Sequence, residues 1–331
     1  MARVVYFGTP AFAVPALRAR SGSPDIEVTL AVTRPGRPAG RGQRLQPSDV
    51  ATAAGDLGIT IFAPQNLRTT DVRDRLAAER ADLFVVAAYG QIFGPKILAL
   101  PSMACLNLHA SLLPRYRGAS PIAAAIVSGD LVTGVSLMVM GEGLDTGPVI
   151  DTVTVPIPAG ATTGSLTTVL AVAAGSLAMA SIPRFLTGEL GPHPQGAGAT
   201  LTRPMVKADG WLDWSRPAVD LAAQVRAMWP WPRAWTIVIR DGLPVAVQIH
   251  AATPVPAETS LAPGTVMVSA GTPAVATGTG HMRLDIVQFP GEGPRSGEAA
   301  VSAGRLRAGM IIGLDHDGPP ERLPLTVPVH S

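Results

Sequence analysis

The sequence predicts a doubly wound α/β domain with a mostly parallel sheet, followed by a second, smaller β-barrel domain. In residues 1–150, short apolar runs typical of buried parallel strands alternate with segments of helical pattern. After residue 205 the apolar runs become shorter, alternate with polar residues and are separated by Gly and Pro turns. With 331 residues, the chain is long enough for each domain to bury a core of its own.

The first domain is expected to occupy residues 1–187. Its strands are predicted where β-branched and other apolar residues run together: 4–7, 28–33, 83–89, 105–110 and 134–140. Helical patterns predict the helices between them and one helix that closes the domain: 11–20, 48–57, 70–80, 119–128 and 164–187. This repetition indicates parallel strands, and such sheets bind ligands beyond the carboxyl ends of their strands.

The rest of the chain divides into three parts. Residues 188–205 are rich in Gly and Pro and lack periodicity, so they are interpreted as a linker. Residues 206–312 carry the short alternating runs of the second domain, which the pattern predicts to be a small barrel or sandwich. Residues 313–331 lack periodicity and are predicted to form a loose tail.

The composition indicates a globular protein in a reducing compartment. The formal charge is only +2, so net charge alone does not identify a nucleic-acid partner. Cys105 is the single cysteine, which excludes an internal disulfide. The first apolar run ends after four residues at Gly8, too short for a signal peptide, and no run approaches the ~18 apolar residues of a membrane span. We therefore expect a cytoplasmic protein with no membrane partner.

Polar residues follow several predicted strands at the edge where ligands bind. The strand over 105–110 contains Asn107 and His109, whose side chains leave the same face because they are two residues apart. Glu142 and Asp145 follow the strand over 134–140, in the glycine-bounded segment GEGLDTGPV. Of the six histidines, only His109 sits at a predicted strand end among other polar groups.

An amide, an imidazole and a carboxylate at one place can transfer an acyl group to an amine. A carboxylate beside an imidazole holds its tautomer and favours its protonated form, while an amide donor stabilises an oxyanion. No activated Ser or Cys is needed when the attacking amine is itself the nucleophile. Asn107, His109 and Asp145 are therefore the predicted catalytic residues, and no metal is expected.

Several segments, in order along both domains, resemble the signature segments of the folate-dependent formyltransferases. They are FGTPAFAVPAL, VTRPGRPAGRGQRLQPSDV, VVAAYGQI, NLHASLLPRYRGASPI, GEGLDTGPV, GWLDWSRPA and WPWPRAWT. The resemblance covers roughly residues 3–310. It implies a Rossmann-like formyltransferase domain and an OB-like second domain. It also implies transfer of a formyl group from 10-formyltetrahydrofolate to an amine, here the α-amino group of initiator methionyl-tRNA.

The resemblance assigns roles to individual residues. Asn107 would polarise the formyl oxygen and hold the oxyanion, His109 would manage proton transfer, and Asp145 would orient His109 and help to take the proton of the amine. Two segments would line the folate pocket: Tyr89, Gly90, Gln91 and Ile92, and Ser111, Leu112, Leu113 and Pro114. For the second of these segments, an ordinary strand-to-helix turn is the alternative reading.

The expected tRNA contacts come from a loop and from the domain junction. Spaced arginines on a Gly and Pro backbone suit phosphate contact, and the loop contributes Arg34, Arg37, Arg41 and Arg44. Lys207 matches a lysine of the family at the junction. Residues 206–310 hold nine basic and eight acidic residues, whereas the barrel of the family is typically basic. The five tryptophans between Trp211 and Trp235 are expected to form the core and the domain seam rather than a base-stacking platform.

Other functions remain open at this point. The same three residues could formylate a nucleotide-linked amino sugar, although the Arg34–Arg44 loop is not expected in the enzymes that act on such sugars. They could also formylate glycinamide ribonucleotide, although the enzymes that do so usually lack a second domain. A hydrolase that passes the formyl group to water is a further possibility. A non-catalytic nucleic-acid-binding protein is disfavoured by the three polar residues, and FGTPAF lacks the spacing of a dinucleotide-binding loop. We expect a monomer.

Overall fold

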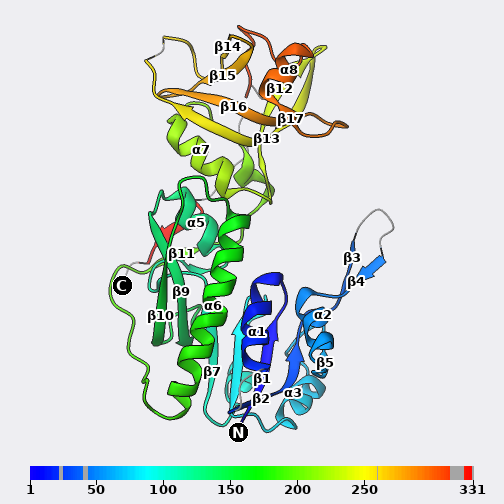
Figure 1. Cartoon of the computed structure of the whole chain (residues 1–331), viewed down its shortest axis with the longest axis vertical. Coiled ribbons are helices and arrows are strands. Elements are labelled where there is room, and N and C mark those ends of the chain that lie inside the picture. The colour runs from blue at the N-terminus through cyan, green and yellow to red at the C-terminus, as the bar shows by residue number, and fades with distance from the viewer. Residues whose placement is uncertain (22–24, 40–43, 259, 314–323, 330–331) are drawn as a thin grey trace.

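The computed structural model describes residues 1–21, 25–39, 44–258, 260–313 and 324–329. Two domains lie one above the other along the long axis of the molecule, joined by an extended segment (Figure 1). The carboxyl ends of the parallel strands in the first domain point toward the second domain (Figure 1).

Seven strands form the sheet of the first domain, in the order β10-β9-β7-β6-β1-β2-β5. Their bounds are β1 (Ala2–Gly8), β2 (Ile26–Val32), β5 (Ile61–Phe62), β6 (Leu83–Ala87), β7 (Ala104–His109), β9 (Val132–Val139) and β10 (Val149–Pro156). The strands from β7 to β5 are parallel, which confirms the mostly parallel sheet. β9 runs antiparallel to β7, and β10 runs antiparallel to β9.

The prediction that residues 134–140 form a parallel strand is wrong. The connection from β7 to β9 contains only a short strand, β8 (Arg117–Gly118), and the helix α5 (Pro121–Val127). This connection stays near the end of β7, because Asp130, just before β9, accepts a hydrogen bond from the Tyr116 hydroxyl, and the Tyr116 carbonyl contacts His109. β9 therefore starts at the edge where β7 ends and runs back beside it, with His109 opposite Ser136.

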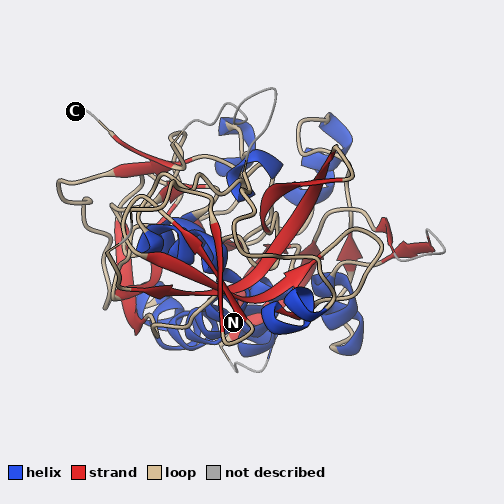
Figure 2. Ribbon diagram, turned by 90° about the horizontal axis from the view of Figure 1, so that it is seen from above, coloured by secondary structure: helices blue, strands red, loops and turns tan. Residues whose placement is uncertain are grey.

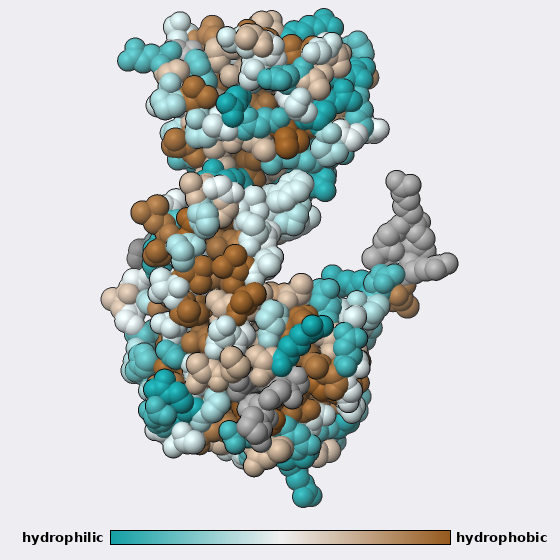
Figure 3. All heavy atoms as spheres, viewed as in Figure 1, coloured by the Kyte–Doolittle hydropathy of each residue, from teal (hydrophilic) through white to brown (hydrophobic). Residues whose placement is uncertain are grey.

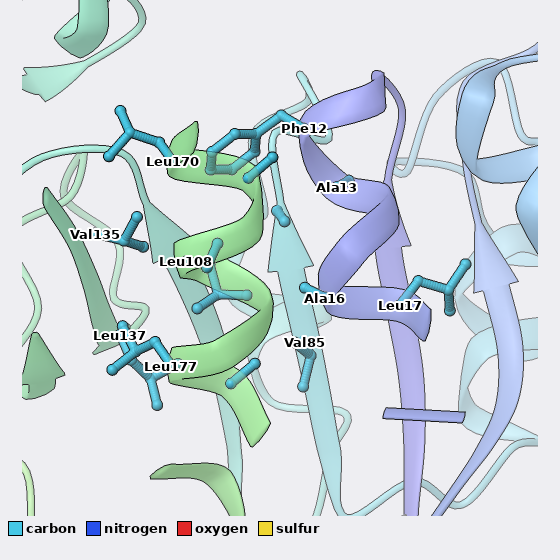
Figure 4. Packing of buried hydrophobic residues seen from close by; sticks show 14 of the residues in the cluster. Phe12, Ala13, Ala16, Leu17, Val85, Leu108, Val135, Leu137, Leu170 and Leu177 are labelled. Carbon is cyan, nitrogen blue, oxygen red and sulfur yellow. The ribbon is translucent and has the colours of Figure 1, made fainter. Parts of the chain in front are cut away.

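Helices cover both faces of this sheet, as a doubly wound fold requires. Their bounds are η1 (Ala11–Ala13), α1 (Val14–Ser21), α2 (Asp49–Asp56), α3 (Thr70–Ala77), α4 (Pro95–Leu98) and α6 (Thr163–Leu186). One core lies between the sheet and α1, α2, α5 and α6. Figure 4 shows its centre, where the Phe12 ring lies beside Leu170 of α6 and Ala16 faces the same helix lower down, with Leu108 of β7 and Val85 of β6 on the sheet. The other core includes α3 and α4.

The helix α6 is long and apolar enough to cross a membrane by length and composition alone. Half of that stretch is buried inside the domain, where α6 packs on α1, β9 and β10. Its start is fixed by a capping box between Thr162 and Ser165. The hydropathy of α6 is therefore accounted for by its place in the core.

The second domain contains a curled antiparallel sheet, which forms a half-barrel and confirms the predicted fold class. Its strands are β12 (Ala234–Arg240), β13 (Leu243–Val255), β14 (Val266–Ser269), β15 (Thr272–Ala276), β16 (His281–Gln288) and β17 (Arg295–Ser296), in the order β12-β13-β16-β15-β14 with β17 beside β16. Its helices are η2 (Lys207–Gly210), α7 (Ala218–Ala227) and α8 (Gly297–Ser302). Residues 310–313 bridge the two edge strands, since Val266 N donates to the Met310 carbonyl and Gly313 N donates to the Ile237 carbonyl, both at 2.7 Å.

The predicted linker and tail are more ordered than the sequence indicates. Within the linker, β11 (Thr200–Thr202) pairs parallel with β8 and antiparallel with β18 (Thr326–Pro328). The prediction of a loose tail is therefore wrong for residues 324–329, because β11 offers its second backbone edge to that segment. Residues 314–323 and 330–331 lie outside the described residues.

The tryptophans are divided between core and surface. Trp211 and Trp214 are buried, in agreement with the expected core, and the Trp229 carbonyl accepts a hydrogen bond from Gly164 N at the start of α6. Trp231 is 55% exposed, so the expectation of a buried seam is wrong for that residue.

Candidate active site

Asn107 and His109 lie on one face of β7, near its carboxyl end. Leu106 and Leu108, which alternate with them, are buried in the core of the opposite face and fix the orientation of the strand. Asn107 is half-buried, and the His109 side chain is only 6% exposed. The sheet therefore presents an amide and an imidazole side by side, as the sequence predicts.

Asp145 joins these two side chains from the loop of residues 140–148. Its Oδ1 accepts a hydrogen bond from Asn107 Nδ2 at 3.3 Å, and its Oδ2 lies 3.5 Å from His109 Nδ1. Asp145 thus contacts both of the other residues predicted as catalytic. Asp145 reaches them in a different way from the one predicted, which placed it after a parallel strand. β9 is antiparallel, so its end does not lie at the carboxyl ends of the parallel strands. The loop instead folds back, and Asp145 adopts a left-handed conformation with φ 51°.

The tautomer of His109 follows from its second nitrogen. His109 Nε2 lies 2.8 Å from the carbonyl oxygen of Tyr116. A carbonyl oxygen only accepts, so Nε2 carries a hydrogen and donates it. The nitrogen that faces Asp145 is therefore Nδ1, and a proton placed there is shared with the carboxylate.

The segment after β7 supports Asp145 through its backbone. Gly118 N donates to Asp145 Oδ2 at 2.8 Å. Gly118 has φ 97°, and a Cβ at this position would lie 2.3 Å from the Thr202 carbonyl oxygen, so only glycine fits. The Thr202 hydroxyl donates to the Arg117 carbonyl at 2.9 Å and accepts from Ser120 N at 3.0 Å. The linker strand β11 thus holds the turn that contacts Asp145.

Tyr116 anchors the same turn on its other side. Its hydroxyl donates to Asp130 Oδ2 at 2.8 Å, and Arg115 Nη2 donates to Asp130 Oδ1 at 3.0 Å. Burial, together with the bond to Asp130, raises the pKa of the Tyr116 hydroxyl. The carbonyl that receives the hydrogen of His109 is therefore held in place by a neutral, hydrogen-bonded side chain.

The two segments predicted to line the folate pocket follow β6 and β7, which are adjacent in the sheet. The Tyr89 ring is buried against Phe7 and Phe93, and the Gln91 amide bonds to the backbone at Gln65 and Leu67. Both side chains are thus committed to the protein. In contrast, Gly90 is exposed, and so is Ile92, at 74%.

The second of these segments is fixed at its start. Ser136 Oγ donates to the Ser111 carbonyl at 2.7 Å and accepts from Leu113 N at 3.1 Å. Ser111 is fully buried, whereas Leu112, Leu113 and Pro114 are half-buried. The partly open side of this segment is therefore made of apolar side chains.

The predicted basic residues are spread over three places. Arg34 is half-buried and contacts the Gly90 carbonyl at 3.5 Å. Arg37 and Arg44 lie on the hairpin of β3 (Arg37–Ala39) and β4 (Arg44–Gln46), which projects away from both domains (Figures 1 and 2). Arg41 lies outside the described residues. Lys207 is exposed at the start of η2, between the domains.

The space between the hairpin and the two domains is open on the side seen in Figure 3. The two domains face each other across this notch (Figure 3). Among the described residues, no cluster of three or more His, Cys, Asp or Glu side chains is placed to hold a metal ion.

Sequence reasoning missed Tyr116, Gly118 and Gln195. The first two lie in the segment RYRG, where a glycine after two arginines gives only a weak indication of a required turn. Gln195 Nε2 donates to the carbonyls of Asp145 and Gly147, both at 2.8 Å. Nothing in its Gly- and Pro-rich surroundings indicates that contact.

The chain matches known families and proteins over most of its length. Residues 2–182 match the family described as formyl transferase, and residues 204–303 match the formyl transferase C-terminal domain. A relative from Roseiflexus, named methionyl-tRNA formyltransferase, is 40% identical over 94% of this chain and 95% of its own length. One of the same name from Gluconobacter oxydans is 44% identical over 87% and 92%.

Solved structures share the fold at much lower identity. The N-formyltransferase of Helicobacter canadensis, solved with folinic acid and dTDP-3-aminofucose, is 15% identical with a TM-score of 0.61, covering 87% of this chain and all of its own. The methionyl-tRNA formyltransferase of Clostridium thermocellum is 16% identical with a TM-score of 0.53, covering 76% of this chain and 93% of its own.

Proposed function

The chain belongs to the formyl transferase family, and from that premise we propose that it transfers the formyl group of 10-formyltetrahydrofolate to the α-amino group of initiator methionyl-tRNA. The observation that carries this proposal is the likeness to methionyl-tRNA formyltransferases, which reaches 40% identity over 94% of the chain. The product is formylmethionyl-tRNA, which serves translation initiation.

The reaction needs a neutral amine and an acceptor for the charge that develops. The α-amino nitrogen attacks the formyl carbon, and the carbonyl oxygen becomes an oxyanion in a tetrahedral intermediate. Asn107 Nδ2 is assigned to donate to this oxygen, since one of its two hydrogens already points to Asp145 and the other is available for a ligand. Such a donor typically contributes about 2.7–4 kcal/mol to the transition state.

His109 and Asp145 are assigned the proton movements. The amine must lose a proton as the new C–N bond forms, and N10 of the folate must gain one as its bond to the formyl carbon breaks. His109 Nδ1 and Asp145 Oδ2 face each other at 3.5 Å, while Nε2 is committed to Tyr116. The pair can therefore hold the proton between its removal from the amine and its delivery to the leaving nitrogen.

The folate is assigned to the adjoining ends of β6 and β7. Exposed backbone at Gly90 offers hydrogen-bonding groups, and exposed Ile92 with half-buried Leu112–Pro114 offers apolar surface for a flat ring. The residues proposed to line the pocket are Tyr89, Gly90, Gln91, Ile92, Ser111, Leu112, Leu113 and Pro114.

The tRNA is assigned to the notch between the hairpin and the domains. Arginines on the hairpin and Lys207 at the junction supply positive charge for phosphates on two sides of it. The proposed contacts are Arg34, Arg37, Arg41, Arg44 and Lys207. We further propose that the protein acts as a monomer in the cytoplasm.

One assay tests the reaction and its acceptor together. Formyl-labelled 10-formyltetrahydrofolate is supplied with methionyl-tRNA, with free methionine and with dTDP-3-aminofucose. We expect label on methionyl-tRNA alone. Label on the sugar nucleotide would favour the amino-sugar alternative, for which the present support is a shared fold at 15% identity. Release of labelled formate without any acceptor would instead indicate a hydrolase.

A further inference from the structure

The side chain of Gln195 has all of its hydrogen-bonding capacity in use. Its Nε2 donates to the carbonyls of Asp145 and Gly147 at 2.8 Å each, and its Oε1 accepts from Arg117 Nε at 3.1 Å and Arg117 Nη2 at 2.8 Å. An amide has two donor hydrogens and two acceptor sites, so these four bonds satisfy it completely. The orientation of the amide is thereby fixed, because only its nitrogen can face two carbonyls and only its oxygen can face a guanidinium.

The residues just before Gln195 attach it beside the loop that carries Asp145. His193 pairs with Val149, with N–H to carbonyl bonds of 2.9 Å in both directions. Val149 is the first residue of β10, directly after the loop that carries Asp145. Part of the predicted linker is therefore attached to the sheet of the first domain, beside the catalytic loop.

The loop needs such an attachment. Residues 141–144 and Thr146 are exposed, and Asp145 has the unfavourable φ of 51° for a residue with a side chain. The ends of the loop are held by backbone bonds, from Met140 N to the Cys105 carbonyl and from Val139 N to the Pro148 carbonyl. Between these ends, the loop is tied to its neighbours by the carboxylate of Asp145 and by the amide of Gln195. The carboxylate must serve the reaction, so the amide of Gln195 is the tie that stays constant through it.

We propose that Gln195 is a positioning residue that holds Asp145 in its catalytic geometry, an inference that rests on the proposed function. It acts on Asp145 from two directions. The Gln195 nitrogen holds the backbone carbonyl of Asp145 itself. The Gln195 oxygen holds the side chain of Arg117, and the next residue, Gly118, donates its N–H to Asp145 Oδ2. Both ends of the amide thus set the distance between Asp145 and His109.

Gln195→Leu removes the four bonds with little change in volume, and two measurements follow from it. The first is the exchange rate of the Gly118 amide hydrogen, measured by NMR, since this hydrogen is bonded to Asp145 Oδ2. We expect faster exchange in the variant.

The second measurement is steady-state kinetics of Gln195→Leu, where kcat should fall by roughly 10- to 100-fold because a displacement near 1 Å has an effect of this size. KM for methionyl-tRNA and for the folate should change by less than about threefold, since all four hydrogen bonds of the Gln195 amide are made to the protein.

Gln224 provides a matched control in the second domain. Its Nε2 donates to the carbonyls of Asp209 and Trp211, at 2.7 and 2.8 Å, and its Oε1 accepts from Arg216 at 3.3 Å. Gln224→Leu removes a similar set of bonds, none of which is made to Asp145, Gly147 or Arg117. It should keep both the wild-type kcat and the exchange rate of Gly118, even if its melting temperature falls.

The outcomes separate this inference from the proposed function. Unchanged exchange of Gly118 in Gln195→Leu overturns the inference, and so does unchanged kcat or a loss confined to KM. A wild-type protein that does not formylate methionyl-tRNA, combined with faster exchange in the variant, overturns the proposed function and supports the attachment of Asp145 by Gln195. If Gln195→Leu does not fold, Gln195→Glu keeps the acceptor for Arg117 but loses the donors, and the same readouts apply.

Discussion

His109 Nδ1 and Asp145 Oδ2 face each other at 3.5 Å, while the other nitrogen of His109 is bonded to the Tyr116 carbonyl. The imidazole is thus held from both sides and cannot rotate without breaking one of the two contacts. In the proposed mechanism the nitrogen that moves protons is Nδ1, which lies beside the carboxylate. The proposed mechanism therefore depends on the turn after β7, which contains Tyr116 and Gly118, as much as on the strand itself.

The first prediction concerns the two polar residues of β7. Asn107→Ala and His109→Ala should each lower kcat by about 100- to 1000-fold, the usual effect of removing an oxyanion donor or a proton-transfer group. Neither should unfold the chain, because neighbouring Leu106 and Leu108 keep the strand in the core. Formylation kinetics and circular dichroism check both points. His281→Ala, in the second domain, serves as the control, and near-normal turnover in either strand variant would contradict its role.

The second prediction concerns Gly118. Gly118→Ala should lower both stability and activity, because the added Cβ would lie 2.3 Å from the Thr202 carbonyl oxygen and would displace the N–H that supports Asp145. Gly58 is a suitable control, with φ 69° and no atom within 4 Å of the position that an added Cβ would take, so Gly58→Ala carries only the backbone strain. Thermal melting and kcat are the measurements. Equal effects of the two substitutions would show that the close approach to Thr202 is unimportant.

The sequence predicts the strands of this site well and its supports poorly. Asn107 and His109 could be placed together because alternation along a strand is a local rule. The antiparallel direction of β9 could not be read from its apolar run, since the run looks the same in either direction and the contacts that keep the chain at the end of β7 are made by Tyr116 and Asp130 in the connection between the strands. Gln195 and Thr202 could not be found at all, because their partners are about 50 and 85 residues away along the chain.

The third prediction concerns the single thiol. Cys105 is buried, its Sγ contacts the Leu98 carbonyl at 3.6 Å, and burial raises the pKa of the thiol to about 12. The reactive species is the thiolate, so at pH 8 only about one molecule in ten thousand would carry it. A disulfide reagent such as Ellman's reagent should leave the native protein unmodified and react with one thiol per chain after unfolding in urea. Rapid labelling of the native protein at pH 8 would contradict this burial.

The fourth prediction concerns pH and Asp82. The backbone N–H of Arg3 and the Ser102 hydroxyl both donate to this carboxylate, which lowers its pKa in the folded state. A lowered pKa means that the ionised form stabilises the fold above the unfolded pKa of about 3.9, and that this contribution is lost as the pH falls through the folded pKa. Asp82→Asn should therefore reduce the melting temperature at pH 7, with a difference from wild type that shrinks below about pH 4. Asp241→Asn, at an exposed position in a turn, is the control, and a difference that is constant with pH would contradict the assignment.

The last prediction concerns the projecting hairpin. Arg37 is exposed on β3, away from the proposed catalytic residues, so Arg37→Ala should raise KM for methionyl-tRNA while kcat and KM for the folate stay near wild type. If Arg37 contacts a phosphate, its loss should also reduce the slope of log KM against log salt concentration by about 0.9 or less, because one fewer counterion is released. Arg80→Ala is the control, since Arg80 is also exposed but precedes β6, at the amino-terminal end of the parallel strands. An unchanged salt slope in Arg37→Ala would place the tRNA elsewhere on the molecule, whatever its effect on KM.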